Sequence, residues 1–252
     1  MNGARAEAAF WAAFLHNRNV DAATAVDGAV AVAGGYALFV DETEIDLAIG
    51  AGSTRALRAD DCEVVQEFYG TRGRAARFEL DVDVFVRSGD LFENRGYTDE
   101  GAEFAVLEAA TMPALPATPE IDVRRTADRR GWIELAERAF NGGHPRLGRT
   151  LEANAAAAQA LVIALVDGVE AGAAALGIAG DTAILYSAAV LPEYRRRGIH
   201  RALITGRLGL AAARGTARAV LKTNHGSSAE RAATALGFTR TGLRRRFRRE
   251  CP

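Results

Sequence analysis

The sequence predicts a mixed α/β fold in two halves, and three observations lead to this prediction. Strand-like segments, which are short and apolar or alternate between apolar and polar residues, are interspersed with segments whose apolar residues have helical spacing. Three of the six prolines fall within residues 112–119, which indicates a stiff connector. Residues 77–96 and 218–237 share one spacing from an arginine to a glycine that precedes an aromatic residue, as in a duplicated unit. The predicted domains are therefore 1–111 and 120–252, joined by the linker.

The N-terminal half alternates between helical and strand-like runs. Within residues 36–49, Thr43, Ile45, Leu47 and Ile49 alternate with polar residues, which is the period of a half-buried strand. The predicted helices are 4–15, 60–69 and 86–97, and the predicted strands are 22–33, 36–49, 76–84 and 102–109.

The C-terminal half has the predicted order β-α-α-β-β-β-α-β-α-β. Its predicted strands are 120–125, 161–166, 170–178, 184–190, 218–222 and 239–249, and its predicted helices are 128–140, 147–158, 199–213 and 228–236. A mixed central sheet flanked by helices is the expected architecture.

Residues 182–204 form the segment around which this half is organised. An apolar strand ends at Pro192, which cannot donate a hydrogen bond to a sheet. A turn containing Gly198 then opens a helix, whose first backbone N–H groups and dipole favour an anion. Because three arginines, residues 195–197, lie in this turn, the segment predicts a site for a phosphate or pyrophosphate.

This segment resembles the signature of the GNAT superfamily of N-acetyltransferases. That signature is a strand, then Val-x-Pro-x-aromatic, then Arg/Gln-x-x-Gly-x-Gly/Ala at the start of a helix. The chain has Val190, Pro192 and Tyr194, followed by Arg195-Arg196-Arg197-Gly198. It departs at His200, where the family usually has Gly or Ala, so a bulkier side chain must find room beside the pyrophosphate.

The resemblance extends over residues 120–250, which follow the strand and helix order of the family and include its Leu-Gly-Phe turn at 236–238. The repeat makes the N-terminal half similar to a degenerate second copy of the same fold, so two GNAT-like domains in tandem are expected. In that copy the corresponding loop, residues 50–61, has no Arg-x-x-Gly and brings Asp60 and Asp61 instead. We therefore expect this half not to bind CoA.

The resemblance implies direct transfer of an acetyl group from acetyl-CoA to an amine, without a covalent enzyme intermediate. A splayed strand at 188–190 would pair with the pantetheine arm and supply an N–H to the thioester carbonyl. Asn224 and Ser228 either contact that arm or cap the last helix. The residues expected to bind the cofactor are Ala188, Ala189, Val190, Arg195, Arg196, Arg197, Gly198, Ile199, His200, Arg201, Asn224 and Ser228.

General acid–base residues are not evident in the sequence. Where family members often place a tyrosine acid in the last helix, this chain has Ala233. Tyr186 is a candidate acid or a packed aromatic, and His144 is a candidate base or a surface loop residue. The missing tyrosine leaves an alternative function open, a CoA-binding sensor or interaction module without catalysis.

Charge is distributed unevenly along the chain. Residues 1–118 contain 20 Asp and Glu against 9 Arg, whereas residues 119–252 contain 12 acidic and 22 basic residues. Either polyanionic CoA is drawn to the basic half and a cationic amine to the acidic one, or the opposite charges help the halves dock. Residues 244–249 include five arginines, and a closing strand facing the acidic half is favoured over a nucleic-acid site.

Other features exclude several classes of protein. No apolar run has the ~18 residues of a membrane span, and the N-terminus lacks a signal-peptide pattern. The two cysteines and four histidines show no metal-ligand spacing, so no metal is expected. We expect a cytoplasmic enzyme without nucleic-acid or membrane partners, which is either a monomer built as a pseudo-dimer or a homodimer.

Overall fold

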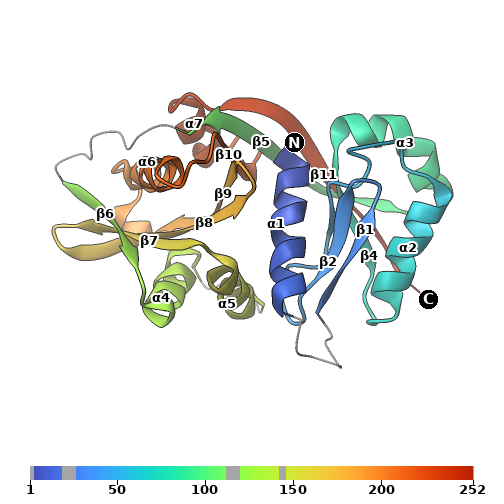
Figure 1. Ribbon diagram of the computed structural model, residues 1–252, viewed down its shortest axis with the longest axis horizontal. Coiled ribbons are helices and arrows are strands. Elements are labelled where there is room, and N and C mark those ends of the chain that lie inside the picture. The colour runs from blue at the N-terminus through green and yellow to red at the C-terminus, as the bar shows by residue number, and fades with distance from the viewer. Residues whose placement is uncertain (1–2, 19–26, 112–119, 142–145, 252) are drawn as a thin grey trace. The chain divides into compact units, whose positions relative to one another are not determined.

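The computed structural model describes residues 3–18, 27–111, 120–141 and 146–251 (Figure 1). The chain forms two compact units. The first unit comprises Met1–Val106 together with Thr241–Pro252, and the second comprises Leu107–Arg240. The final segment of the chain therefore belongs to the first unit.

The first unit is a sheet covered by helices on both of its faces. Its elements are α1 (Gly3–Arg18), β1 (Gly28–Val32), β2 (Gly35–Phe39), β3 (Ala48–Ile49), α2 (Ala59–Gly70), β4 (Ala76–Asp81), α3 (Val82–Asn94), the first part of β5 (Thr98–Ala110), and β11 (Thr239–Arg249). The strand order is β1-β2-β3-β4-β11-β5. Helix α1 covers one face, and α2 and α3 cover the other (Figure 1).

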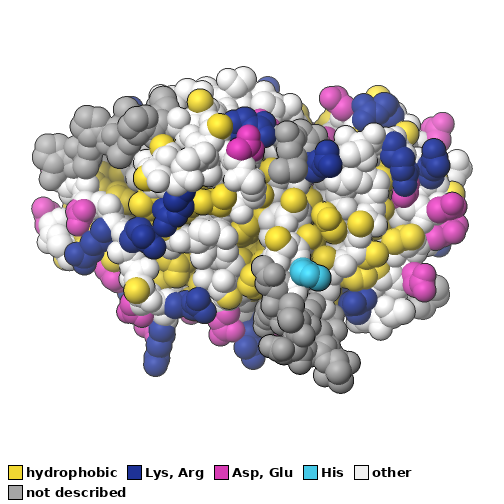
Figure 2. Space-filling view, viewed as in Figure 1, with side chains coloured by type: hydrophobic (Ala, Val, Ile, Leu, Met, Phe, Trp, Pro, Cys, Tyr) yellow, Lys and Arg dark blue, Asp and Glu magenta, His cyan; other side chains and the backbone are white. Residues whose placement is uncertain are grey.

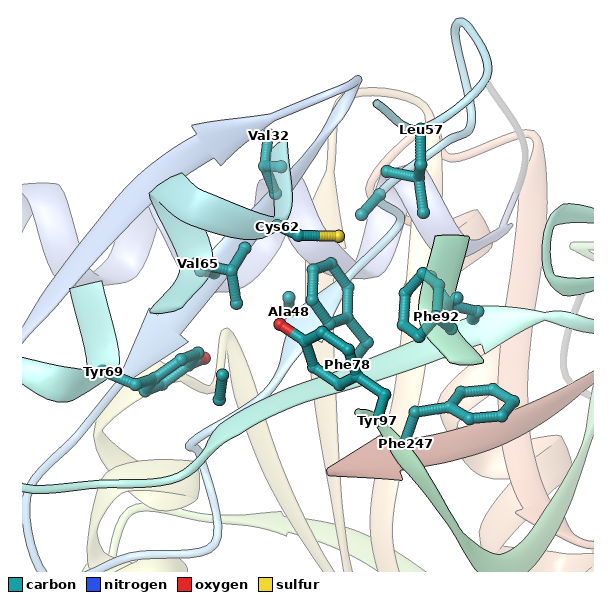
Figure 3. Packing of buried hydrophobic residues seen from close by; sticks show 14 of the residues in the cluster. Val32, Ala48, Leu57, Cys62, Val65, Tyr69, Phe78, Phe92, Tyr97 and Phe247 are labelled. Atoms are coloured by element: carbon teal, nitrogen blue, oxygen red, sulfur yellow. The ribbon is translucent and has the colours of Figure 1, made fainter. Parts of the chain in front are cut away.

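Aromatic side chains from distant parts of the sequence fill the core of this unit (Figure 3). The rings of Phe78 and Phe92 meet edge to face with centroids 5.1 Å apart. Phe247, from β11, is 2% exposed, and its ring stacks on that of Phe85 at 4.4 Å. Burial of such rings is a main source of stability, so the last strand contributes directly to the first unit's core.

The arginines of β11 bind carboxylates of the same unit. The Nη1 group of Arg244 donates to Glu7 at 2.6 Å and to Glu79 at 3.1 Å, and its Nε donates to Asp81 at 3.1 Å. Arg246 donates to the second oxygen of Glu79 at 3.0 Å. The arginine-rich run is thus a strand paired with acidic residues, as the sequence favoured, and part of the charge asymmetry is balanced within the unit.

The second unit has the same layered plan. Its elements are β6 (Ile121–Thr126), α4 (Arg129–Ala139), α5 (Leu147–Ala157), β7 (Ala160–Val166), β8 (Val169–Ala179), β9 (Thr182–Val190), the 3-10 turn η1 (Pro192–Tyr194), α6 (Ile199–Ala212), β10 (Arg218–Asn224) and α7 (Ser228–Thr234). The strand order is β5-β10-β9-β8-β7-β6, with the end of β5 at the edge. Helix α6 covers one face, and α4 and α5 cover the other (Figure 1).

Both units contain a parallel pair of strands joined by a helix. In the first unit β3 pairs with β4 on either side of α2, and in the second β9 pairs with β10 on either side of α6. The order of elements around these pairs is shared, which supports the predicted repeat. The mixed α/β fold with a sheet flanked by helices is confirmed.

Two expectations differ from the structure. Residues 36–49 are not one strand, because the chain turns back after Phe39 and β3 pairs antiparallel with β2. The hydroxyl of Thr43 donates to the carbonyl of Val40 and accepts the N–H of Ile45, and these bonds stabilise the turn. The compact units also differ from the predicted division at 111 and 120, since β11 lies in the first unit. The predicted linker, 112–119, lies outside the described residues.

No helix in the described ranges combines the length and the apolar character that a bilayer crossing requires.

Candidate functional site

The predicted anion turn lies between β9 and α6. Pro192 opens the 3-10 turn that ends the strand. Gly198 is the N-cap of α6 with φ of 82°, a left-handed conformation that glycine adopts without steric strain. The carbonyl of Gly198 already accepts the N–H of Ala202 at 3.0 Å. The N–H groups of the first helical residues, 199–201, are therefore placed to bind an anion.

The parallel strands β9 and β10 separate next to this turn. Their ladder runs from the pair Thr182 and Arg218 to the pair Leu185 and Leu221. Both strands continue beyond that pair, β9 to Val190 and β10 to Asn224. Backbone groups of the two diverging ends are consequently available to an extended ligand, as the resemblance implies for pantetheine.

A bulge in β9 marks the point of separation. Ala173 pairs with Ala189 and Ala175 pairs with Tyr186, so Ala174 lies opposite two residues of β9. One of these, Ser187, has φ of 48°, a conformation that is unusual for a residue other than glycine. A strained bulge beside a cavity commonly redirects backbone groups toward a ligand.

Residues of α5 hold the bulge. The side-chain amide of Asn154 donates to the hydroxyl of Ser187 at 2.7 Å, and the Tyr186 hydroxyl donates to the Asn154 carbonyl at 2.9 Å. Asn154 is only 8% exposed, although it lies in an alanine-rich helix. Buried polar groups of this kind are stabilised only when their partners are in place.

A cavity of about 830 Å³ connects the anion turn with the separated strands. This volume is within the range of small-molecule and cofactor sites. It is lined by Ala139, Phe140, Ala188, Ala189, Val190, Tyr194, Arg195, Arg196, Gly198, Ile199, His200, Arg201, Thr223, Asn224, Ser227, Ser228, Ala229 and Ala232.

The structure brings together all but one of the residues expected to bind the cofactor. The exception is Arg197, whose guanidinium lies over the Tyr194 ring, 5.4 Å from its centroid. Arg195 has a structural part as well, because its Nε donates to the carbonyl of Val190 and its Nη2 to that of Ala139, each at 3.2 Å. Arg196 and Arg201 are exposed and line the cavity.

The last helix of the unit has its own cap. The hydroxyl of Ser227 accepts the N–H of Glu230 at 3.1 Å, and the Glu230 carboxylate accepts the N–H of Gly226 at 2.6 Å. Because Ser227 is the cap, Ser228 and Asn224 are free of that task, and both line the cavity.

His200 lines the cavity with an uncharged side chain. Burial, with a smaller effect of the Arg207 charge, lowers its pKa to about 4. The imidazole is therefore uncharged at neutral pH. At the anion turn, charge is supplied by arginines and the helix end instead.

Tyr186, the candidate acid, does not line this cavity. Its hydroxyl is bonded to Asn154, and burial raises its pKa. A tyrosine with a raised pKa is a weaker acid, which disfavours the predicted role. His144 lies outside the described residues. Ala233 is fully buried in α7, so a methyl group occupies the position of the usual tyrosine.

Sequence reasoning missed Asn154 and Arg207. Arg207 is 2% exposed and donates to carbonyls of β8 and β9. The sequence did indicate that Arg207 is buried, because this residue falls among Leu203, Ile204 and Leu208 on the apolar face of a predicted helix. Asn154 had no comparable signal beyond its place in an alanine run.

Comparison with known proteins agrees with this geometry. A model of the acetyltransferase (GNAT) family matches residues 129–238, which include the whole cavity lining. The comparison with curated proteins found no match.

Solved structures show the same fold. A GCN5-related N-acetyltransferase from Kribbella flavida superposes with a TM-score of 0.71 at 16% identity, covering 98% of this chain and 96% of that chain. One from Sphaerobacter thermophilus gives 0.61 at 18%, with coverages of 81% and 72%. A protein described as a tandem GNAT protein from the clavulanic acid biosynthesis pathway gives 0.57 at 13%, with coverages of 82% and 75%.

Proposed function

Because residues 129–238 form a domain of the acetyltransferase (GNAT) family, we propose that the chain transfers an acetyl group from acetyl-CoA directly to an amine. The observation that carries the proposal is the single cavity that joins the N-terminus of α6 to the bulge of β9. Acetyl-CoA would supply the activated thioester, and the chain would bind and orient it.

Each part of the cavity suits one part of the cofactor. The backbone N–H groups of Ile199, His200 and Arg201, with the Arg196 and Arg201 side chains, would hold the diphosphate. The separated end of β9, at Ala188 to Val190, would pair with the peptide-like pantetheine arm. Asn224 and Ser228 would add polar contacts from the other side.

The bulge would contribute to the transfer itself. An N–H turned out of the β8–β9 ladder near Ala188 would polarise the thioester carbonyl as charge develops on its oxygen. Positioning of the amine and thioester accounts for a further part of the rate. Neither contribution needs a dedicated acid.

The acceptor in this proposal is a small molecule or peptide with a cationic amine. The hypothesis that acidic residues of the first unit attract it must allow for ion pairs: Asp41 binds Arg74, Asp46 binds Arg77, and Asp61 binds Arg55. Figure 2 shows acidic and basic side chains interleaved over α2 and α3 on the face drawn. Such steering is screened by salt, so kcat/KM for the amine would fall as ionic strength rises.

Calorimetry with acetyl-CoA tests the binding site. Gly198→Glu places a carboxylate at the anion turn, and like-charge repulsion of several kcal/mol should weaken binding by more than ~100-fold. Gly180→Glu is a matched control, since Gly180 also has positive φ, at 57°, has open space around it and does not line the cavity. Unchanged affinity in Gly198→Glu, or equal loss in both variants, would refute the site.

A second function, CoA binding without catalysis, is favoured by one observation, the buried methyl group of Ala233 at the usual acid position. A panel of small amines, aminoglycosides, polyamines and peptide N-termini, monitored by release of free thiol, distinguishes the two. Thiol release above the hydrolysis background supports the enzyme. Binding without release across the panel supports the sensor.

A further inference from the structure

Arg207 is a buried cation in the middle of α6. Its Nε donates to the carbonyl of Leu203 at 2.9 Å, one turn earlier in the helix. Its Nη1 donates to the carbonyls of Ala175 at 3.1 Å and Tyr186 at 3.2 Å. The guanidinium therefore reaches from the helix to the pair of residues at which the regular β8–β9 ladder meets the bulge.

The counter-charges of Arg207 differ from those of Arg244, another arginine that is fully buried. Arg244 binds three carboxylates, those of Glu7, Glu79 and Asp81. In the described ranges no carboxylate pairs with Arg207, whose polar contacts are backbone carbonyls. Burial lowers the pKa of Arg207 to about 9, which leaves it charged at neutral pH. A buried charge without a counter-charge is destabilising, so an anion that binds nearby would interact favourably with the Arg207 guanidinium.

The charge lies close to the proposed cofactor cavity. Ser187 follows Tyr186 in the bulge, and the next residue, Ala188, lines the cavity. His200 also lines the cavity, and the Arg207 charge adds to burial in lowering the pKa of its imidazole. The field of the guanidinium thus reaches the cavity wall at the side of the bulge.

We propose that Arg207 is a positioning residue of the acyl transfer, which fixes the bulge of β9 and stabilises the departing CoA thiolate with its positive charge. This inference rests on the proposed function. In the transfer, the amine first loses its ammonium proton to water, and its nitrogen lone pair then forms a bond to the carbonyl carbon while the carbon–sulfur bond breaks. The electron pair leaves with sulfur as a thiolate, and the amine proton passes to water. Because Ala233 replaces the usual acid, stabilising the anion takes the place of protonating it.

Two other titratable groups near Arg207 are uncharged over the pH range of the titration proposed below, about pH 6 to 9. Tyr186 from β9 has a raised pKa, and its hydroxyl is bonded to Asn154. His200, on the same helix, is uncharged well above its lowered pKa. Arg196 and Arg201 also line the cavity, but they remain unchanged in the variants compared below.

The test is the ionisation of the thiol of bound CoA, which needs no acceptor. Ultraviolet absorbance of the thiolate is titrated between about pH 6 and 9 for free CoA and for the complex, with the same protein lacking CoA subtracted to remove its two cysteines. The variants are Arg207→Met, Arg207→Lys and, as control, Arg214→Met, where the exposed Arg214 side chain donates to the carbonyl of Leu210. Calorimetry measures the CoA affinity of each.

In the wild type we expect the bound thiol to ionise about 1 pH unit below free CoA. Arg207→Met should abolish this shift and Arg207→Lys should restore part of it, while Arg214→Met leaves it unchanged. With an acceptor in hand, kcat should fall ~10-fold in Arg207→Met with little change in KM for acetyl-CoA.

The outcomes separate the inference from the function on which it rests. If CoA binds to the wild type but its thiol ionises like that of free CoA, the inference is wrong and the proposed function stands. That comparison needs no variant, so misfolding of Arg207→Met would not obscure it. If the wild type binds no CoA, both are wrong. An equal shift in wild type and folded Arg207→Met would also overturn the role of Arg207.

Discussion

Replacing Arg244 by methionine should destabilise the first unit selectively. The side chain is fully buried, and it binds Glu7, Glu79 and Asp81 at 2.6 to 3.1 Å. Methionine leaves these carboxylates without their common partner. Removing one partner of a buried ion pair costs roughly 3–5 kcal/mol of stability.

The structure places the expected loss near the lower end of that range. Glu79 keeps the Nε of Arg246 at 3.0 Å, and Asp81 has a side chain that is 26% exposed and can be hydrated. We therefore expect the free energy of unfolding to fall by about 3 kcal/mol at neutral pH. The difference should shrink below about pH 4, where protonation removes the uncompensated negative charge.

The two tryptophans of the chain make the assay specific to one unit. Trp11 lies in α1 of the first unit and Trp132 in α4 of the second. Urea unfolding is followed by fluorescence in a Trp132→Phe background, which reports the first unit, and in a Trp11→Phe background, which reports the second. Arg248→Met is the control, since Arg248 is 49% exposed and pairs with the exposed Glu250. That pair should contribute less than ~1 kcal/mol.

A result in which Arg244→Met shifts the Trp11 transition no more than Arg248→Met does would refute the reasoning. A shift confined to the Trp132 signal would show that the last strand stabilises the second unit instead, as the sequence alone suggested.

Three further results are expected. Gly172→Ala should weaken acetyl-CoA binding ~10-fold by calorimetry, because its Cβ would lie 2.8 Å from the carbonyl oxygen of Ala189 in the cavity wall, whereas Gly180→Ala should not. Asp61→Asn should destabilise the chain by ~1–3 kcal/mol at neutral pH in urea titrations. Hydrogen bonding from Arg55 lowers the pKa of Asp61, so this difference should be present above about pH 4 and vanish as pH falls through the lowered value. His200 has a folded-state pKa of about 4, below its unfolded value. Wild type should therefore lose stability between about pH 6.5 and 4 in excess of His200→Asn, and equal pH profiles would contradict its burial.

The anion turn was predictable because its determinants are local. Pro192 ends the strand, Gly198 adopts the left-handed conformation, and the helix begins at the next residue, all within one short segment. Apolar periodicity likewise located the helices and strands of the second unit. In residues 36–49, however, the alternation of apolar and polar residues gave a wrong prediction. Two strands of a hairpin, joined by a turn that Thr43 stabilises, can show the same alternation as one continuous strand.

The placement of β11 and the supports of the bulge were not predictable in this way. The alternation within residues 239–249 indicates a strand but not which neighbour it pairs with. Its pairing with β4 depends on Phe247 and Arg244 finding partners more than 160 residues earlier in the chain. The contacts of Asn154 with Ser187 and of Arg207 with Ala175 each join segments more than 30 residues apart. Local sequence patterns do not identify partners that lie so far apart in the chain.

The two helix starts carry different charged groups, although the units share a strand–helix–strand plan. At α6 the N-cap is a glycine, and arginines face the cavity there. At α2 the Asp61 carboxylate accepts the backbone N–H of Arg58 at 2.8 Å and both Nη groups of Arg55 at 2.6 and 2.7 Å. A carboxylate of the chain itself thus lies at the start of α2, where its negative charge would repel a phosphate. A unit that keeps the strand–helix–strand plan but has a carboxylate at its helix start would not compete for the cofactor that we propose for the second unit.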